Sequence, residues 1–197
     1  MLQHIPTLEN NKTKLQPLDK KDTDALAEIA IAQPDLFQFM SQQLNSTADV
    51  YAYIRKGLDE FNEGASLPFL IIDKESGKVA GTTRFGNLVK EHKRVEIGWT
   101  WISKEFHNTG LNKAMKFLML QYAFETLEFN RVEIKTSEIN YISRRAIESL
   151  GATFEGILRH HIINDNGSLR NTVYYSILKE EWPEIKERIF GKYKDKW

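Results

Sequence analysis

The sequence predicts a mixed α+β fold in which helices cover the faces of one β-sheet. Short apolar runs at strand spacing and longer apolar runs at helical spacing follow one another along the chain. Their order is strand, two helices, three strands, helix, strand, helix, two strands and a last helix. Because strands and helices are interspersed, a sheet with helices packed on it buries the apolar side of each element.

Composition bounds the class of protein. The chain has 197 residues, of which 41% are hydrophobic, so one domain with an ordinary core is expected over residues 1–197. It has no cysteine, which excludes disulfides, thiolate metal sites and thiol nucleophiles. Its 27 basic and 27 acidic residues balance, so neither a nucleic acid nor a membrane is an expected partner, while a homodimer stays open. No apolar leader or ~20-residue apolar span is present, and a cytoplasmic location is expected.

The N-terminal half predicts a strand, two helices and a β-hairpin. Residues 15–18 form a short strand, and the helix that follows ends at Pro34, because proline lacks the amide that a helix interior needs. A second helix is expected over residues 49–61, whose apolar positions share one stripe. Residues 69–85 contain two strand patterns around a polar turn with glycine, which is typical of a hairpin.

The C-terminal half predicts alternating strands and helices, then a hairpin and a last helix. The elements are bounded by turn residues, and they are a strand over 95–102, a helix over 111–127, a strand over 132–136, a helix over 143–150 closed by Gly151, strands over 153–163 and 168–178, and a helix from about 180. The charged tail from Gly191 is expected to be loose.

Alternation along strand 95–102 divides its side chains between the two faces of the sheet. Strict alternation gives one face made of Val95, Ile97, Trp99 and Trp101, and an opposite face made of Glu96, Gly98, Thr100 and Ile102. At least one of the two tryptophans is expected to pack in the core, because large aromatic residues at alternate positions are typical of a half-buried strand.

Residues 94–117 combine a strand, a short polar turn and the start of a long helix. The start of a helix exposes free backbone N–H groups and the positive end of the helix dipole, so a phosphate group fits there. Lys113 and Lys116 either add positive charge nearby or are ordinary solvated helix residues. The chain lacks Gly-x-x-x-x-Gly-Lys-[Ser/Thr] and Gly-x-Gly-x-x-Gly, which argues against a nucleotide-binding protein built on this turn.

Several short motifs follow one another between about residue 15 and residue 185. They are Glu-Ile-Gly-Trp at 96–99, His-Asn-Thr-Gly-Leu-Asn at 107–112, Asn-Tyr-Ile-Ser at 140–143, Leu-Gly-Ala at 150–152, Glu-Gly at 155–156 and Asn-Gly at 166–167. In order and spacing this set resembles the RimJ/RimL-like branch of the GNAT acetyltransferase superfamily. The turn differs from the family's pattern at two positions: this chain has His107 where the family has Gln or Arg, and Asn112 where the family has Gly or Ala. The turn is therefore expected to act through its backbone groups.

The resemblance implies a GNAT fold, with a central mixed, mostly antiparallel twisted sheet of about seven strands that splays at the cofactor site between flanking helices. It implies an N-acetyltransferase that moves an acetyl group from acetyl-CoA to a primary amine by direct attack in a ternary complex, without a metal. The amine is a protein N-terminal α-amine or belongs to a small molecule, and the sequence does not choose between them. A non-catalytic acyl-CoA-binding sensor or partner protein of the same fold is the alternative.

The same resemblance assigns residues to the cofactor. The turn would cradle the pyrophosphate with the backbone of His107, Asn108, Thr109, Gly110, Leu111 and Asn112. Backbone groups near Trp101 and Ile102 would pair with the pantetheine arm in a gap between strands 95–102 and 132–136. Asn140 would bind a cofactor amide, cap the helix that follows, or do both.

The catalytic residues are assigned by resemblance as well. Ser143 is the expected acid beside the departing thiolate, with helix capping as its alternative role, and Ile147 stands where many family members carry a tyrosine acid. Glu96 is the expected base because it faces the substrate cleft, with a salt bridge at the sheet edge as its alternative role. His160 and His161 are weaker candidates for proton handling.

Overall fold

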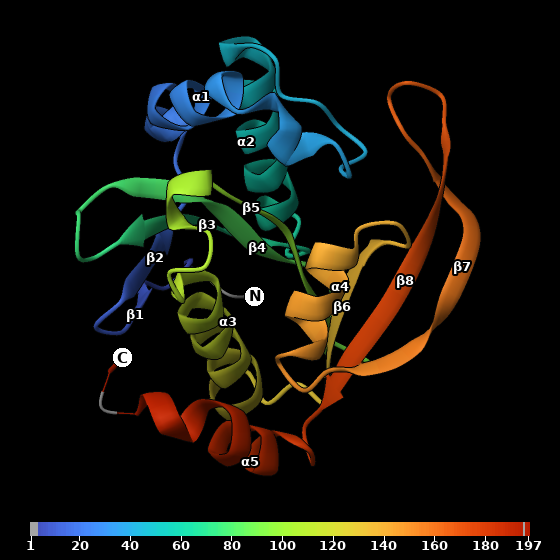
Figure 1. Ribbon diagram of the computed structural model, residues 1–197. Coiled ribbons are helices and arrows are strands. Elements are labelled where there is room, and N and C mark those ends of the chain that lie inside the picture. Colours follow the sequence, from blue (N-terminus) through green and yellow to red (C-terminus); the bar gives the residue numbers. More distant parts are fainter. Residues whose placement is uncertain (1–3, 195) are drawn as a thin grey trace.

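The computed structural model describes residues 4–194 and 196–197, and it contains one eight-stranded sheet with helices on both faces (Figure 1). The strands are β1 (Leu8–Glu9), β2 (Thr13–Pro17), β3 (Leu67–Asp73), β4 (Val79–Val89), β5 (Arg94–Ile102), β6 (Arg131–Ser137), β7 (Thr153–Ile163) and β8 (Leu169–Leu178). The helices are α1 (Thr23–Ala32), α2 (Thr47–Asn62), α3 (Leu111–Gln121), α4 (Tyr141–Glu148) and α5 (Trp182–Ile185). The expected α+β architecture is confirmed, with β1 as a short additional edge strand.

The strand order in the sheet is β1-β2-β3-β4-β5-β6-β8-β7. Every neighbouring pair is antiparallel except β5 and β6, which run parallel. The parallel pair is joined through α3, as a parallel connection requires a crossover rather than a tight turn. The sheet is therefore mixed and mostly antiparallel, as the sequence predicted.

Two apolar clusters fix the helices to opposite faces of the sheet. On one face, Leu26 of α1 and Ile54 of α2 are fully buried in a cluster with Trp101 of β5. On the other face, residues of α3, α4 and α5, such as Met115 and Ile185, join a larger cluster with the strands. Figure 1 shows α1 and α2 together above the sheet, with α3 and α5 below.

Side-chain caps set where two of the helices begin. The hydroxyl of Ser46 accepts from the amide of Asp49 at 3.2 Å, and the Asp49 carboxylate in turn accepts from the Ser46 hydroxyl at 2.8 Å. The side chain of Asn140 accepts from the amide of Ser143 at 3.1 Å and caps α4 in the same way. The helix predicted over residues 111–127 is α3, and it continues as one π-helical turn over Tyr122–Thr126.

A β-bulge in β5 corrects the predicted division of its side chains. Arg84 pairs with Gly98 and Thr82 with Trp101, so Thr83 alone faces two residues, Trp99 and Thr100. Trp99 has a φ of 50°, in the left-handed region. The extra residue reverses the alternation beyond it. The α3 face consequently carries Val95, Ile97, Thr100 and Ile102, whereas Trp99 and Trp101 pack toward α1 and α2.

The prediction of a loose tail was wrong for the residues that the structure describes there. The ring of Trp197 stacks on Tyr193 with centroids 4.2 Å apart and approaches Phe117 of α3 at 6.1 Å. Aromatic side chains thus dock the end of the chain on the larger apolar cluster. Among the described residues, every helix is too short or too polar to cross a bilayer.

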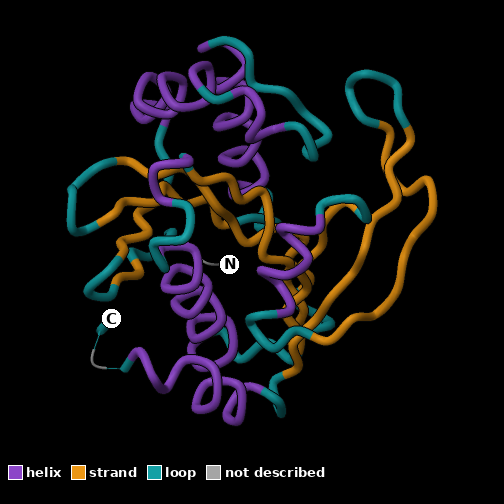
Figure 2. Tube along the Cα trace, in the orientation of Figure 1, coloured by secondary structure: helices purple, strands orange, loops and turns teal. Residues whose placement is uncertain are grey.

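The β7–β8 hairpin reaches the segment that connects α1 to α2, beside which it rises in Figure 2. The amide of Asp165, in the hairpin turn, donates to the carbonyl of Ser41 at 3.1 Å, and its carboxylate accepts from the amide of Gln43 at 3.0 Å. On β8, Arg170 donates to the carbonyl of Phe39 at 3.1 Å. These contacts join the hairpin to the segment between α1 and α2.

Candidate active site

The turn before α3 has the geometry of an anion site. Asn108 and Gly110 have φ values of 61° and 87°, and the hydroxyl of Thr109 donates to the carbonyl of Phe106 at 2.9 Å. The first helical bond runs from the amide of Ala114 to the carbonyl of Gly110 at 3.0 Å. Within the described part of the chain, the amides of Asn108, Thr109, Gly110, Asn112 and Lys113 have no backbone or side-chain acceptor. Free amides at the start of a helix suit a phosphate.

The ring of His107 ties this turn to the end of β5. Its Nε2 lies 2.9 Å from the carbonyl oxygen of Ile102, so that nitrogen carries the hydrogen and donates it. The contact occupies the carbonyl of Ile102, which leaves the amide as the group that Ile102 can offer a ligand. His107 therefore positions the turn, and its ring is not free to bind a phosphate through Nε2.

The two parallel strands separate beside the turn. β5 and β6 pair from Arg94 to Glu96 and from Arg131 to Glu133, while the described residues 97–102 and 134–137 do not pair with each other. One edge of β5 is consequently without a strand partner along the segment that contains Trp101. The indole of Trp101 lies in the core, 5.3 Å from the ring of Phe37, so any contact that Trp101 makes with a ligand comes from its backbone.

Hydroxyl groups hold the bulge of β5 from both faces. The phenol of Tyr53 donates to the carbonyl of Trp99 at 2.9 Å, and burial raises the pKa of this phenol, so it keeps its proton. From the α3 side, Thr100 donates to the carbonyl of Gly98 at 3.3 Å and shares a 2.7 Å hydrogen bond with Thr83. The bulge is thereby fixed at the level where β5 and β6 part.

Glu96 is buried on the α1–α2 side of the sheet, with 3% of its surface exposed. Its Oε2 lies 2.8 Å from the Lys135 ammonium and accepts from the Asn87 amide at 2.7 Å. Burial acts to lower the pKa of Lys135, but the charge of Glu96 and its hydrogen bond outweigh it and raise that pKa. The structure therefore contains the salt bridge considered for Glu96, and it places this salt bridge in the interior of the sheet.

The start of α4 carries the two polar residues that the sequence singled out. Asn140 caps the helix through its Oδ1, which confirms the capping role and leaves its amide nitrogen available. Ser143 receives that cap through its backbone, so its hydroxyl is not the capping group. Ile147 is buried in the core with 5% exposure, and its side chain carries no hydroxyl.

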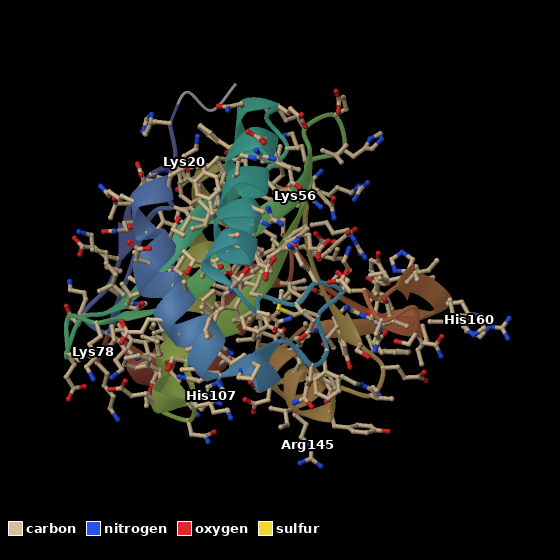
Figure 3. The ribbon with its side chains drawn as sticks, turned by 90° about the horizontal axis from the view of Figure 1, so that it is seen from above. Lys20, Lys56, Lys78, His107, Arg145 and His160 are labelled. Atoms are coloured by element: carbon tan, nitrogen blue, oxygen red, sulfur yellow. The ribbon has the colours of Figure 1, made fainter. Side chains whose placement is uncertain are left out.

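Arg170 and the two histidines occupy different places on the hairpin. Arg170 is half-buried, burial lowers its pKa, and its Nε has no hydrogen-bond partner among the described residues. His161 packs against the ring of Tyr174 with centroids 5.7 Å apart. His160 is exposed at the bulged part of β7, at the outer edge of the molecule and far from His107 (Figure 3).

Lys116 is the residue whose position the sequence did not predict. It is neither a phosphate-turn cation nor a solvated helix residue, because it is 6% exposed and points from α3 to the hydroxyl of Thr100 at 2.9 Å. The spacing of apolar residues along α3 held a signal, since Lys116 lies between the buried Met115 and the half-buried Phe117. Lys113, in contrast, lies near the surface, 5.9 Å from the ring centroid of Tyr193.

Comparison with known proteins agrees with this geometry. A family model described as the acetyltransferase (GNAT) domain matches residues 12–153. The chain is 34% identical over 181 residues to YdaF of Bacillus subtilis (strain 168), provisionally named a ribosomal N-acetyltransferase, across 88% of this chain and 94% of that protein. It is 27% identical over 182 residues to the uncharacterized N-acetyltransferase p20 of Bacillus licheniformis, across 90% and 99%.

Solved structures share the whole fold. A GCN5-related N-acetyltransferase from Brucella melitensis superposes with a TM-score of 0.87 at 28% identity, over 95% of this chain and 85% of that one. RimJ of Mycobacterium smegmatis, solved with CoA-disulfide, has the same fold with a TM-score of 0.83 at 20% identity, over 95% of each chain. The molecule is an acyltransferase. The chain belongs to the GNAT family, whose members use acetyl-CoA and act on amines.

Proposed function

We propose that this protein transfers the acetyl group of acetyl-CoA to a primary amine by direct attack, with the acceptor amine and the donor bound together. The observation that carries the proposal is the set of free amides in the turn before α3, beside the unpaired edge of β5. These are the amides of Asn108, Thr109, Gly110, Asn112 and Lys113. The turn accommodates a pyrophosphate, and the separated strands accommodate an extended arm that ends near the bulge. Both features fit one elongated, phosphorylated donor, which supplies the activated acetyl group when bound.

The residues around the bulge have distinct roles in the proposal. Backbone amides of the turn bind the pyrophosphate, and backbone groups at Trp101 and Ile102 hold the arm that leads to the acetyl group. Asn140 adds an amide contact. Glu96 takes a proton from the acceptor ammonium, directly or through a water molecule, so that a neutral amine attacks. Ser143 donates a hydrogen bond to the departing thiolate.

The acceptor is proposed to be a protein N-terminal α-amine or a small-molecule amine that enters from the α1–α2 side. The name of the relative YdaF refers to ribosomal substrates, and its 34% identity makes such an N-terminus the first acceptor to test.

A non-catalytic acyl-CoA sensor is the second candidate. It is favoured by Ile147, which is buried and supplies no hydroxyl where family members carry an acid. The two functions differ in turnover. Incubation with acetyl-CoA and a panel of amines, followed by measurement of free CoA, separates them, because binding without release supports the sensor. Absence of CoA binding refutes both candidates.

The role of Ser143 has a direct test. We expect Ser143→Ala to lower kcat by at least ~10-fold while the affinity for acetyl-CoA changes little, because the lost hydrogen bond forms with the leaving group. Steady-state kinetics with the best amine of the panel measures both quantities. An unchanged kcat removes Ser143 from the mechanism without affecting the rest of the proposal.

A further inference from the structure

Lys116 is a buried cation without an ion pair. Its amine donates to the hydroxyl of Thr100 at 2.9 Å, and in the described part of the chain it has no carboxylate within 4.0 Å. The side chain is 6% exposed. An ammonium that leaves water without a counter-ion is unfavourable, so a fold that retains one at such a position has either neutralised it or uses it.

Lys116 and Glu96 lie on opposite faces of the sheet, on either side of Gly98. On the α3 face, Lys116 binds Thr100, which itself donates to the carbonyl of Gly98 at 3.3 Å. On the α1–α2 face, the Oε1 atom of Glu96 comes so close to Gly98 that a Cβ added there would lie 2.9 Å from it. β5 parts from β6 immediately after Glu96, so these two ionisable groups bracket the point where the sheet opens.

We infer that Lys116 supplies the proton that the departing CoA thiolate takes up, while Glu96 on the other face receives the proton of the attacking amine. This inference rests on the proposed function. In the step, the amine nitrogen forms a bond to the acetyl carbon, and the carbon–sulfur bond breaks with its electron pair on sulfur. Lys116 gives a proton to that sulfur, Glu96 takes one from nitrogen, and exchange with solvent restores both groups.

The electrostatic environment suits this role. Burial lowers the pKa of Lys116 to about 7, and the negative charge of Glu96 opposes that effect. Glu96 on β5 is the titratable group whose charge acts on Lys116 among the described residues, whereas β4 and the bulge present the hydroxyls of Thr83 and Thr100. An amine with a pKa near neutrality transfers protons effectively at physiological pH. Two ionisable groups in contrasting environments at one site commonly divide acid and base roles.

The test compares Lys116→Met with Lys116→Arg. Methionine matches the length of the side chain without a proton, and arginine keeps the positive charge but holds its proton too tightly to donate it. We expect both variants to lower kcat by at least ~10-fold and to bind CoA, measured by calorimetry, within ~3-fold of the wild-type affinity. The wild-type kcat should fall as pH rises above about 7, and this decrease should be absent from the pH–rate profiles of both variants.

Lys179→Met, at an exposed position just after β8, is the matched control and should retain the wild-type kcat and pH profile. A wild-type kcat in Lys116→Met would overturn the inference, and so would a wild-type kcat in Lys116→Arg. A decrease of kcat above about pH 7 that persists in Lys116→Met would overturn it as well. Thermal unfolding confirms that each variant is folded. If the wild-type protein releases no CoA with any amine, the proposed function fails, which is a distinct result from a variant that matches an active wild type.

Discussion

Replacing Lys116 with methionine should stabilise the free protein, by an amount that depends on pH. The pKa of this amine falls from 10.5 to about 7 on folding because the side chain is buried. The difference of about 3.5, at about 1.4 kcal/mol per pKa unit, gives at most about 5 kcal/mol of destabilisation when the amine is charged in both states. The folded pKa lies below the unfolded one, so the unfolded chain binds more protons between pH 7 and 10.5, and wild-type stability rises across this window.

The assay is urea unfolding of both proteins, followed by tryptophan fluorescence, at pH 6, 8 and 10. Below pH 7 the variant should be more stable by up to about 5 kcal/mol, and by pH 10 the difference should fall below about 1 kcal/mol. Other titrating groups occur in both proteins, so their contributions largely cancel in the difference. A difference that is the same at all three values, or a variant that is less stable at pH 6, would refute the idea that this lysine is desolvated.

Other predictions concern the turn, the α4 cap and the base. Gly110→Ala should lower the free energy of unfolding by about 1–2 kcal/mol, because Gly110 has a φ of 87°, and should weaken CoA binding at least ~10-fold. Gly167→Ala, at a φ of 78° in the hairpin turn, should lower the free energy of unfolding by the same amount and leave CoA binding normal. Asn140→Ala should lower the free energy of unfolding, measured with urea, by about 1 kcal/mol and should weaken CoA binding. Ser46→Ala, which removes the cap of α2, should lower stability and leave CoA binding unchanged. Glu96→Gln should lower kcat about 100-fold with CoA affinity retained, and steady-state rates near those of the wild type would exclude Glu96 as the base.

The sequence was sufficient to predict the helices and strands and the turn before α3, because both depend on local patterns. Apolar spacing located each main helix and strand, and the Gly110 turn lies between a strand and a helix as expected. The predicted assignment of the β5 side chains to the two faces of the sheet was wrong beyond Gly98, because strict alternation assumes a regular strand. Whether Trp99 and Thr100 together oppose one residue depends on the partner strand β4, which a local pattern does not contain.

The buried position of the Lys116 side chain was not predicted, for a related reason. A lysine on a predicted helix is normally solvated, and local spacing does not say that this one points at the hydroxyl of Thr100 on the strand beneath the helix. The ion pair of Glu96 with Lys135 likewise depends on the register between β5 and β6. Residue types and motifs thus predicted the family and the fold, whereas partners on other strands and helices determine which ionisable groups meet around β5.

The contacts between the β7–β8 hairpin and the connection after α1 join residues that are 122 and 131 positions apart in the chain. Closing so long a segment has a high entropic cost before any contact compensates for it, so such contacts tend to form late in folding. The turn at 107–112 is local and depends on its own residues and the adjacent strand end. A newly made chain should therefore form the turn at 107–112 before it completes the contacts between the β7–β8 hairpin and the connection after α1.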